Sequence, residues 1–224
     1  MVADRHPCPD GFDFCETDVS REDDVAAMMD AAKGKFGRVD ILVNNAGIQP
    51  LGVGFKDLTG PLLERTFAVN VHGVAFGIKH AGRVLGDHGR VINMASFVGV
   101  IATPGAAAYA PSKAAVIHLT RLGAIDLAPR RITVNSVSPG TIRTPAVTDI
   151  PDNPEISFIE GRTPFGRLGE PHEVAALCHF LASDESAYIT AQNIVIDGGL
   201  TTGWTDYALV PPGNVQKGRW VDDL

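Results

Sequence analysis

The feature that most constrains the fold is an alternation of short β-branched runs with longer helical patterns along the whole chain. Such alternation is typical of βαβ units on a parallel sheet. The runs predict strands at residues 12–16, 39–44, 90–96, 131–138 and 193–197. The helical patterns predict helices at residues 21–36, 60–85, 109–127 and 170–181. The chain is therefore expected to form one α/β domain over residues 1–224, with a doubly wound, Rossmann-like parallel sheet.

Composition excludes several classes of partner. The 224 residues carry 19 Lys and Arg against 26 Asp and Glu, a net charge of −7, which argues against nucleic acid or an anionic membrane as the main partner. No apolar run reaches the roughly 18 residues of a membrane span, and the first residues lack the apolar core of a secretory signal. The three cysteines fit neither a disulfide framework nor zinc spacing. We expect a cytoplasmic protein with reduced thiols and no metal site.

Polar or turn-forming residues stand at the end of four of the predicted strands or just past it. They are Asp18, Asn45, Ser96 and the pair Pro139 and Gly140. The carboxyl ends of parallel strands meet at one edge of the sheet, and ligands of doubly wound sheets bind there. These positions therefore predict a binding site at that edge.

Tyr109 and Lys113 form the sharpest local pattern, because residues four apart share one face of a helix. A nearby ammonium favours the ionised form of a phenol, which would suit Tyr109 for acid/base chemistry. Ser96, thirteen residues before Tyr109, is placed to stabilise charge on a substrate oxygen. Alternatives remain for each residue: a solvated helix face for the pair, a turn residue for Ser96, and a buried amide satisfied by backbone for Asn70.

A wider set of motifs accompanies these residues in a fixed order. It comprises NNAG at 44–47, Asn70, Ser96, YAPSK at 109–113, NSVSPG at 135–140, GRLGEP at 166–171 and DGG at 197–199. Together they resemble the short-chain dehydrogenase/reductase family, in its single-domain form, over about residues 12–199. The resemblance implies an oxidoreductase that uses NAD or NADP to interconvert a secondary alcohol and a ketone.

The resemblance also implies a role for each catalytic position. Tyr109 would be the general acid/base, and Lys113 would lower its pKa; both would contact the coenzyme, Lys113 at the nicotinamide ribose. Ser96 would orient the substrate oxygen, and Asn70 would hold a water in a proton relay. The further coenzyme contacts would be Asp18, Val19, Asn45, Ala46, Gly47, Pro139, Gly140, Ile142 and Thr144.

The remaining segments have expected roles as well. Residues 145–166, inside a polar loop rich in proline, would form a lid over a small-molecule alcohol or ketone. The family resemblance implies a homo-oligomer, a dimer or a tetramer, built around the helix that carries Tyr109. Residues 200–224 read as an irregular tail, in which Trp204, Tyr207 and Trp220 would serve as packing anchors.

The front of the chain departs from the family pattern. No Thr-Gly-x-x-x-Gly-x-Gly motif is present, and only about eleven residues precede the strand at 12–16. A βαβ unit needs about 30 residues, so the domain is expected to be N-terminally truncated, without its first strand, helix and second strand. Strand 39–44 would then expose an apolar edge. The residue that selects NAD or NADP normally follows the second strand, so we expect it to be absent too.

Three explanations for this front stay open: a recorded start that is too late, a truncated paralogue, or completion of the sheet by a partner or domain swap. They lead to two functions. The first is an active NAD(P)-dependent oxidoreductase, which the complete set of Asn70, Ser96, Tyr109 and Lys113 favours. The alternative is a non-catalytic subunit for binding or oligomer formation, which the absent phosphate-binding turn favours.

Overall fold

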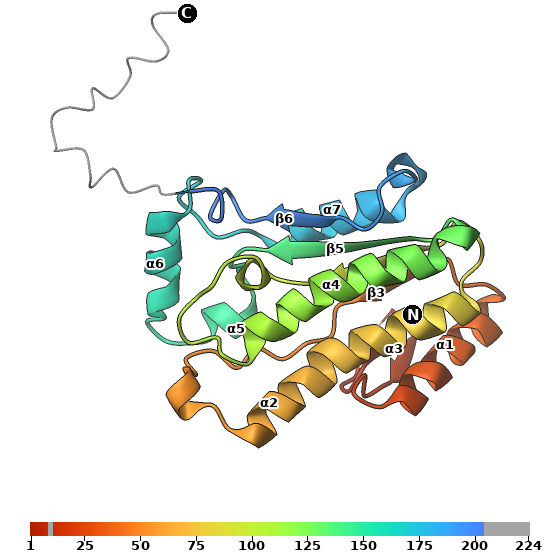
Figure 1. Ribbon diagram of the computed structural model, residues 1–224, viewed down its shortest axis with the longest axis horizontal. Helices are drawn as coiled ribbons and strands as arrows, with labels where there is room; N and C mark the ends of the chain where they lie inside the picture. Colours follow the sequence, from red (N-terminus) through yellow and green to blue (C-terminus); the bar gives the residue numbers. More distant parts are fainter. Residues whose placement is uncertain (9–10, 204–224) are drawn as a thin grey trace, which may run out of the picture.

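Parallel strands form two hydrogen-bonded sheets in the computed structural model, which describes residues 1–8 and 11–203 (Figure 1). The smaller sheet pairs β1 (Val2–Asp4) with β2 (Phe14–Glu16). The larger sheet runs in the order β3 (Ile41–Asn44), β4 (Arg90–Met94), β5 (Thr133–Pro139) and β6 (Asn193–Ile196). Every pairing between these strands is parallel, which confirms the predicted Rossmann-like α/β architecture.

Helices cover both faces of the larger sheet, because its strands are apolar on both sides. α1 (Glu22–Phe36), α3 (Gly73–Val84) and α4 (Tyr109–Leu127) lie over one face, and α7 (Pro171–Ala182) lies over the other (Figure 1). Successive residues of β4 show the alternation: Val91 packs in the core under α3 and α4, while Ile92 packs in the core under α7.

The helix predicted over residues 60–85 is interrupted by a π-helical turn. α2 (Gly60–Phe67) leads into the turn Ala68–His72, and α3 follows without a break in the chain of helical residues. The turn is centred on Asn70, which is fully buried. Such turns widen a helix locally and are frequent at functional sites.

The segment predicted as a loop lid contains two short helices, α5 (Pro145–Thr148) and α6 (Pro154–Arg162). Each begins with proline at its first position, where the missing N–H costs no hydrogen bond. Figure 1 shows both helices at the end of the molecule toward which the arrowheads of β5 and β6 point. The segment therefore lies over the carboxyl edge of the sheet, as a lid would.

The N-terminal residues correct one expectation. Val2–Asp4 forms a strand, β1, parallel to β2, where the sequence was expected to offer no second strand. Three residues are too short for a periodic signal, so the strand is visible only through its pairing with β2. Backbone bonds extend the pairing, because Val2 N–H donates to Asp13 O at 2.7 Å and Thr17 N–H donates to Asp4 O at 2.9 Å. The expectation that no strand would precede and pair with β2 is therefore wrong.

Among the described residues, no strand joins β1 and β2 to the larger sheet. α1 joins the two parts, because its Met29 is buried in the core cluster that also contains Leu42 of β3 and Ala81 of α3. Ion pairs at the surface, between Lys79 and Glu22 and between Arg83 and Asp30, also link α3 to α1. In a doubly wound sheet of strand order 3-2-1-4-5-6, the break between β1 and β3 falls at the position of strand 1. β3 is consequently an edge strand, with Ile41 and Val43 46% and 43% exposed, which confirms the predicted apolar edge.

Two kinds of feature are absent from the described residues. No helix there has both the length and the apolar character needed to cross a bilayer. No group of three or more His, Cys, Asp or Glu side chains there is placed to hold a metal ion. The tail aromatics Trp204, Tyr207 and Trp220 lie outside the described residues.

Candidate active site

A pocket of about 870 Å³ opens at the carboxyl ends of β3, β4 and β5. Its size is within the range of small-molecule sites, which is roughly 300–1,000 Å³. The structure brings most of the sequence-predicted residues into its lining: Asn45, Gly47, Ser96, Tyr109, Lys113, Pro139, Gly140, Ile142 and Thr144. Segments about a hundred residues apart in the chain therefore converge on one cavity, as the strand-end argument predicts.

Close packing of a short turn on α4 sets the distance between Ser96 and Tyr109. Ser96 caps the 3₁₀ turn Phe97–Gly99, with its hydroxyl oxygen accepting the Val98 N–H at 3.4 Å. A Cβ at Gly99 would lie 2.8 Å from the carbonyl carbon of Lys113, so only glycine allows this approach. The Ser96 side chain thereby reaches the first turn of α4 and hydrogen-bonds Tyr109.

The titration of Tyr109 differs from the sequence prediction. Burial raises the pKa of the phenol, whose residue is 8% exposed; the Ser96 hydrogen bond opposes that rise, and the charge of Glu155 adds to it. The Lys113 ammonium, expected to lower this pKa, lies 5.6 Å from the ring centroid and donates to Met94 O at 2.8 Å. Burial in turn lowers the pKa of Lys113 to about 8. Desolvation is therefore the main cause of the pKa shift of both Tyr109 and Lys113.

Asn70 lies behind the pocket and does not line it. Its side-chain oxygen accepts the Ile48 N–H at 2.8 Å, and its amide nitrogen donates to Ile48 O at 2.9 Å and to Ser112 Oγ at 3.0 Å. Both amide protons are thus engaged within the protein, as the buried-amide interpretation predicts. Asn70 therefore fixes the loop after β3 against the π-helical turn; the expected relay water is not held by its amide protons.

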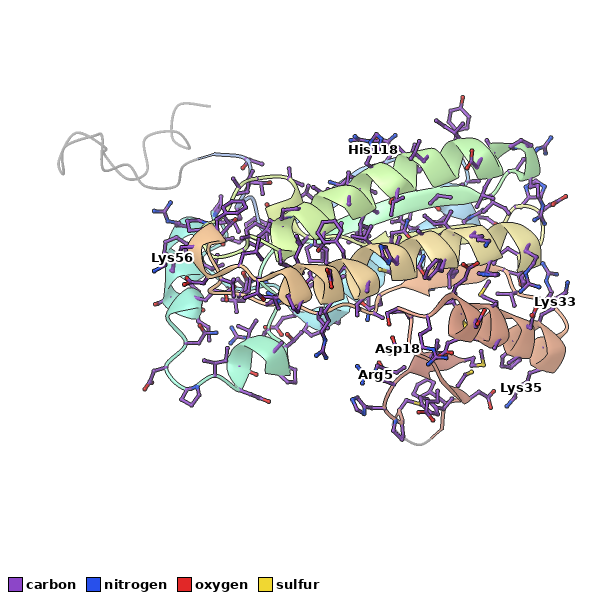
Figure 2. The ribbon with its side chains drawn as sticks, turned by 60° about the horizontal axis from the view of Figure 1, so that its bottom comes forward. Arg5, Asp18, Lys33, Lys35, Lys56 and His118 are labelled. Carbon is purple, nitrogen blue, oxygen red and sulfur yellow. The ribbon has the colours of Figure 1, made fainter. Side chains whose placement is uncertain are left out.

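Three predicted coenzyme residues are absent from the pocket lining: Asp18 and Val19, which follow β2, and Ala46, which lies between the lining residues Asn45 and Gly47. Asp18 follows β2, where its carboxylate accepts the Ser20 hydroxyl at 2.6 Å, and this bond contributes most to the lowering of its pKa. Figure 2 shows Asp18 beside Arg5, and the ion pair between them measures 3.9 Å. This group lies at the carboxyl end of the smaller sheet, on the other side of the break from the pocket.

Known proteins resemble this chain in both sequence and structure. Residues 3–201 match the family model described as enoyl-(acyl carrier protein) reductase. The short-chain dehydrogenase/reductase of Serratia marcescens BCRC 10948 superposes with a TM-score of 0.77 at 36% identity, over 84% of this chain and 76% of that one. This chain belongs to the short-chain dehydrogenase/reductase family.

Curated relatives of this family share similar identity with the chain but differ in the substrates their names give. The 3-oxoacyl-[acyl-carrier-protein] reductase FabG of Thermotoga maritima is 38% identical over 89% of this chain and 81% of its own length. Cis-4-hydroxycyclohexanecarboxylate dehydrogenase of Sinomonas cyclohexanicum is 37% identical over 84% and 76%. Cyclopentanol dehydrogenase of Comamonas testosteroni is 38% identical over 84% and 76%.

Coverage varies among the relatives. The chain spans 34% of the length of an uncharacterized short-chain type dehydrogenase/reductase, y4vI, of Sinorhizobium fredii, to which it is 38% identical over 186 residues. It spans about three quarters or more of the three dehydrogenases and reductases named above.

The pocket residues fit the nicotinamide end of the coenzyme that this family uses. Two glycines of the lining, Gly47 and Gly140, stand where a side chain would meet neighbouring atoms. A Cβ at Gly47 would lie 3.2 Å from Asn70 Oδ1 and 3.4 Å from Lys113 Nζ, and one at Gly140 would lie 2.9 Å from Asp197 Cα. Lys113 lies beside Gly47 and donates to Met94 O, and it is the cation of the described lining that could meet a ribose hydroxyl.

The sequence analysis missed two carboxylates, one at the end of β1 and one in the pocket lining. Asp4 ends β1 and lies on the edge that also carries Asp18; recognising the three-residue strand would have identified it. Glu155 lines the pocket, although the sequence analysis gives it no role of its own within the expected lid at residues 145–166. No sequence signal separates Glu155 from its neighbours, because its position depends on how α6 folds back over the sheet edge.

Proposed function

We propose that this chain transfers a hydride between a nicotinamide coenzyme and a secondary alcohol or ketone, with Tyr109 as the acid/base. One observation carries the proposal: Ser96, Tyr109 and Lys113 form a buried cluster at the wall of the 870 Å³ pocket. Membership of an oxidoreductase family supports it. The coenzyme supplies the hydride acceptor or donor, and the protein supplies the proton and the orientation of the substrate oxygen.

The protonation states favour Tyr109 as an acid in the resting protein. Because its pKa is raised, the phenol is protonated at neutral pH and is ready to donate to a carbonyl oxygen. The Ser96 hydroxyl lies beside the phenol and can donate a hydrogen bond to the same substrate oxygen as negative charge develops on that oxygen. In the direction of alcohol oxidation Tyr109 must accept a proton, so we expect that direction to gain rate as pH rises.

We further propose that NAD is preferred over NADP, on account of Asp4. Its carboxylate ends β1, which occupies the second-strand position where an acid binds the adenosine ribose of NAD in Rossmann folds. The side chain is exposed, with Oδ1 accepting the His6 N–H at 3.0 Å. A 2′-phosphate placed there would meet a like charge. Asp4→Asn should therefore narrow the preference for NADH over NADPH, whereas Asp13→Asn, an exposed acid near the same strands, should not.

A homo-oligomer is consistent with one apolar surface. Leu122 and Ile125 of α4 are exposed, 48% and 70%, on the helix face that points away from the sheet. We expect a second copy to cover this face, as the family resemblance implies for the Tyr109 helix. Ile125→Lys should lower the mass of the protein measured by light scattering, and an unchanged mass would exclude the α4 face as the contact.

Substitution of Tyr109 by phenylalanine tests the proposed reaction. Removing the phenol oxygen should lower kcat for cyclopentanol oxidation by about 10²–10⁴-fold, the usual contribution of a positioned acid/base. Tyr109→Phe should still melt cooperatively and still bind coenzyme, because the ring remains to fill its buried place. A variant that keeps more than about a tenth of the wild-type rate would contradict the assignment.

A further inference from the structure

The pocket wall beyond the catalytic cluster is largely apolar. It is built by Ile48, Leu51, Phe97, Val98, Val147 and Phe158, together with a few polar groups. Among the described residues that line the pocket, Lys113 and Glu155 carry the formal charges. Lys113 donates to Met94 O and lies over the Tyr109 ring, so its charge lies at the catalytic cluster. Glu155 is therefore the charge that a substrate side group would meet.

Glu155 is fixed in place rather than free in solvent. It stands in the first turn of α6, where its N–H donates to Asn153 Oδ1 at 3.0 Å. Asn153 in turn donates to Val147 O at 2.9 Å, which ties the start of α6 to α5. The carboxylate Oε1 accepts the hydroxyl of Thr141, a buried residue after β5, at 3.1 Å. Two helices and the end of a strand thus hold this side chain over the pocket.

The carboxylate is also within electrostatic reach of the catalytic group. Its negative charge contributes to the raised pKa of Tyr109. A charge that acts on the phenol also acts on any charged group of a substrate bound against that phenol. In a partly desolvated pocket, like charges repel more strongly than they do in water.

We propose that Glu155 is a specificity residue that restricts the site to secondary alcohols and ketones without a negative charge. The assignment rests on the proposed function above. A substrate carboxylate or phosphate would face Glu155 across an apolar wall, with no free cation in the described lining to balance it. An uncharged alicyclic or aliphatic alcohol meets no such penalty and matches the apolar wall. Family likeness alone leaves this choice open, since the names of similar relatives include both a hydroxycarboxylate and a neutral alcohol.

Two substrates with the same ring and hydroxyl group, one negatively charged and one neutral, test the proposal: 4-hydroxycyclohexanecarboxylate and its methyl ester. The wild-type protein should oxidise the ester with a kcat/KM roughly tenfold or more above that of the acid. Glu155→Gln keeps an oxygen that can accept the Thr141 hydroxyl but removes the charge. It should reduce that ratio by roughly tenfold, through a lower KM for the acid. Glu160→Gln, on the same helix but outside the pocket lining, is the matched control and should keep the wild-type ratio.

A binding measurement separates failure of this proposal from failure of the proposed function. Calorimetric titration with cyclohexanecarboxylate and with its methyl ester needs no turnover, and Glu155→Gln should gain affinity for the acid alone. If neither substrate is oxidised but this gain appears, the selectivity of Glu155 stands and the oxidoreductase function fails. If turnover occurs and Glu155→Gln leaves the ratio and the affinity for the acid unchanged, the role of Glu155 is overturned.

Discussion

At the scale of single residues, burial controls the chemistry of the site. Lys113 has its pKa lowered from 10.5 to about 8 by desolvation. Its folded pKa is below its unfolded value, so the ammonium destabilises the fold below pH 8, and the cost disappears as pH rises from 8 to 10.5. The shift corresponds to roughly 3 kcal/mol at neutral pH.

Lys113→Met should therefore be at least as stable as the wild type at pH 7 while losing activity. The stability difference between the two proteins should shrink as pH rises from 8 to 10.5. Urea unfolding at pH 7 and at about pH 10 measures both effects. A variant destabilised by more than about 2 kcal/mol at pH 7 would show that the ammonium stabilises the fold instead.

The sequence predicted where these side chains lie but not how they titrate. The spacing of Tyr109 and Lys113, and the position of Ser96 after its strand, sufficed to place all three in one pocket. The predicted direction of the Tyr109 pKa shift was wrong, because the shift depends on how deeply the packed helix buries the phenol. Burial is a property of the tertiary structure, and helical spacing carries no measure of it.

At the scale of elements, the π-helical turn and the loop after β3 act as one unit through Asn70. Asn70→Ala would leave the buried N–H and C=O groups of Ile48 without their partner, at a cost of about 2–4 kcal/mol. The loop that carries Gly47 should loosen, so affinity for NADH should fall as well. Unfolding and coenzyme titration of the same preparation measure both losses.

A control for this prediction is Gln192→Ala, an exposed amide that donates to Thr190 O at 3.0 Å. It should change the free energy of unfolding by less than about 0.5 kcal/mol, because water replaces the lost bond. An equal loss of stability in the two variants would contradict the proposal that Asn70 holds the loop after β3 against the π-helical turn.

Long or continuously apolar elements were predictable from the sequence, and short ones were not. α4 has the predicted boundaries, Tyr109–Leu127, and the strands of the larger sheet begin and end within two residues of their predicted limits. β1 spans three residues and α5 four, so neither contains enough residues for a period to appear. The π-helical turn has no pattern of its own, because it keeps the helical periodicity on both sides.

At the scale of the whole molecule, the break between β1 and β3 leaves an apolar edge. Exposed apolar edge strands pair with other chains, so the purified protein should self-associate through β3. Val43→Lys should reduce this association at equal concentration, because a charge on the edge opposes pairing. Val100→Lys, at a valine of similar exposure outside the sheets, should not. Light scattering across a concentration series measures the association of each variant. Equal association of the two variants would exclude the β3 edge as the contact.

The break also separates the pocket from Asp4 and Asp18, which makes coenzyme binding the decisive property of the whole chain. The most direct measurement is a fluorescence titration of the purified protein with NADH and with NADPH, beside a thermal melt followed by circular dichroism. We expect a cooperative melt and saturable binding, tighter for NADH because of Asp4. A chain that melts cooperatively but binds neither coenzyme would contradict the oxidoreductase account and favour a non-catalytic subunit.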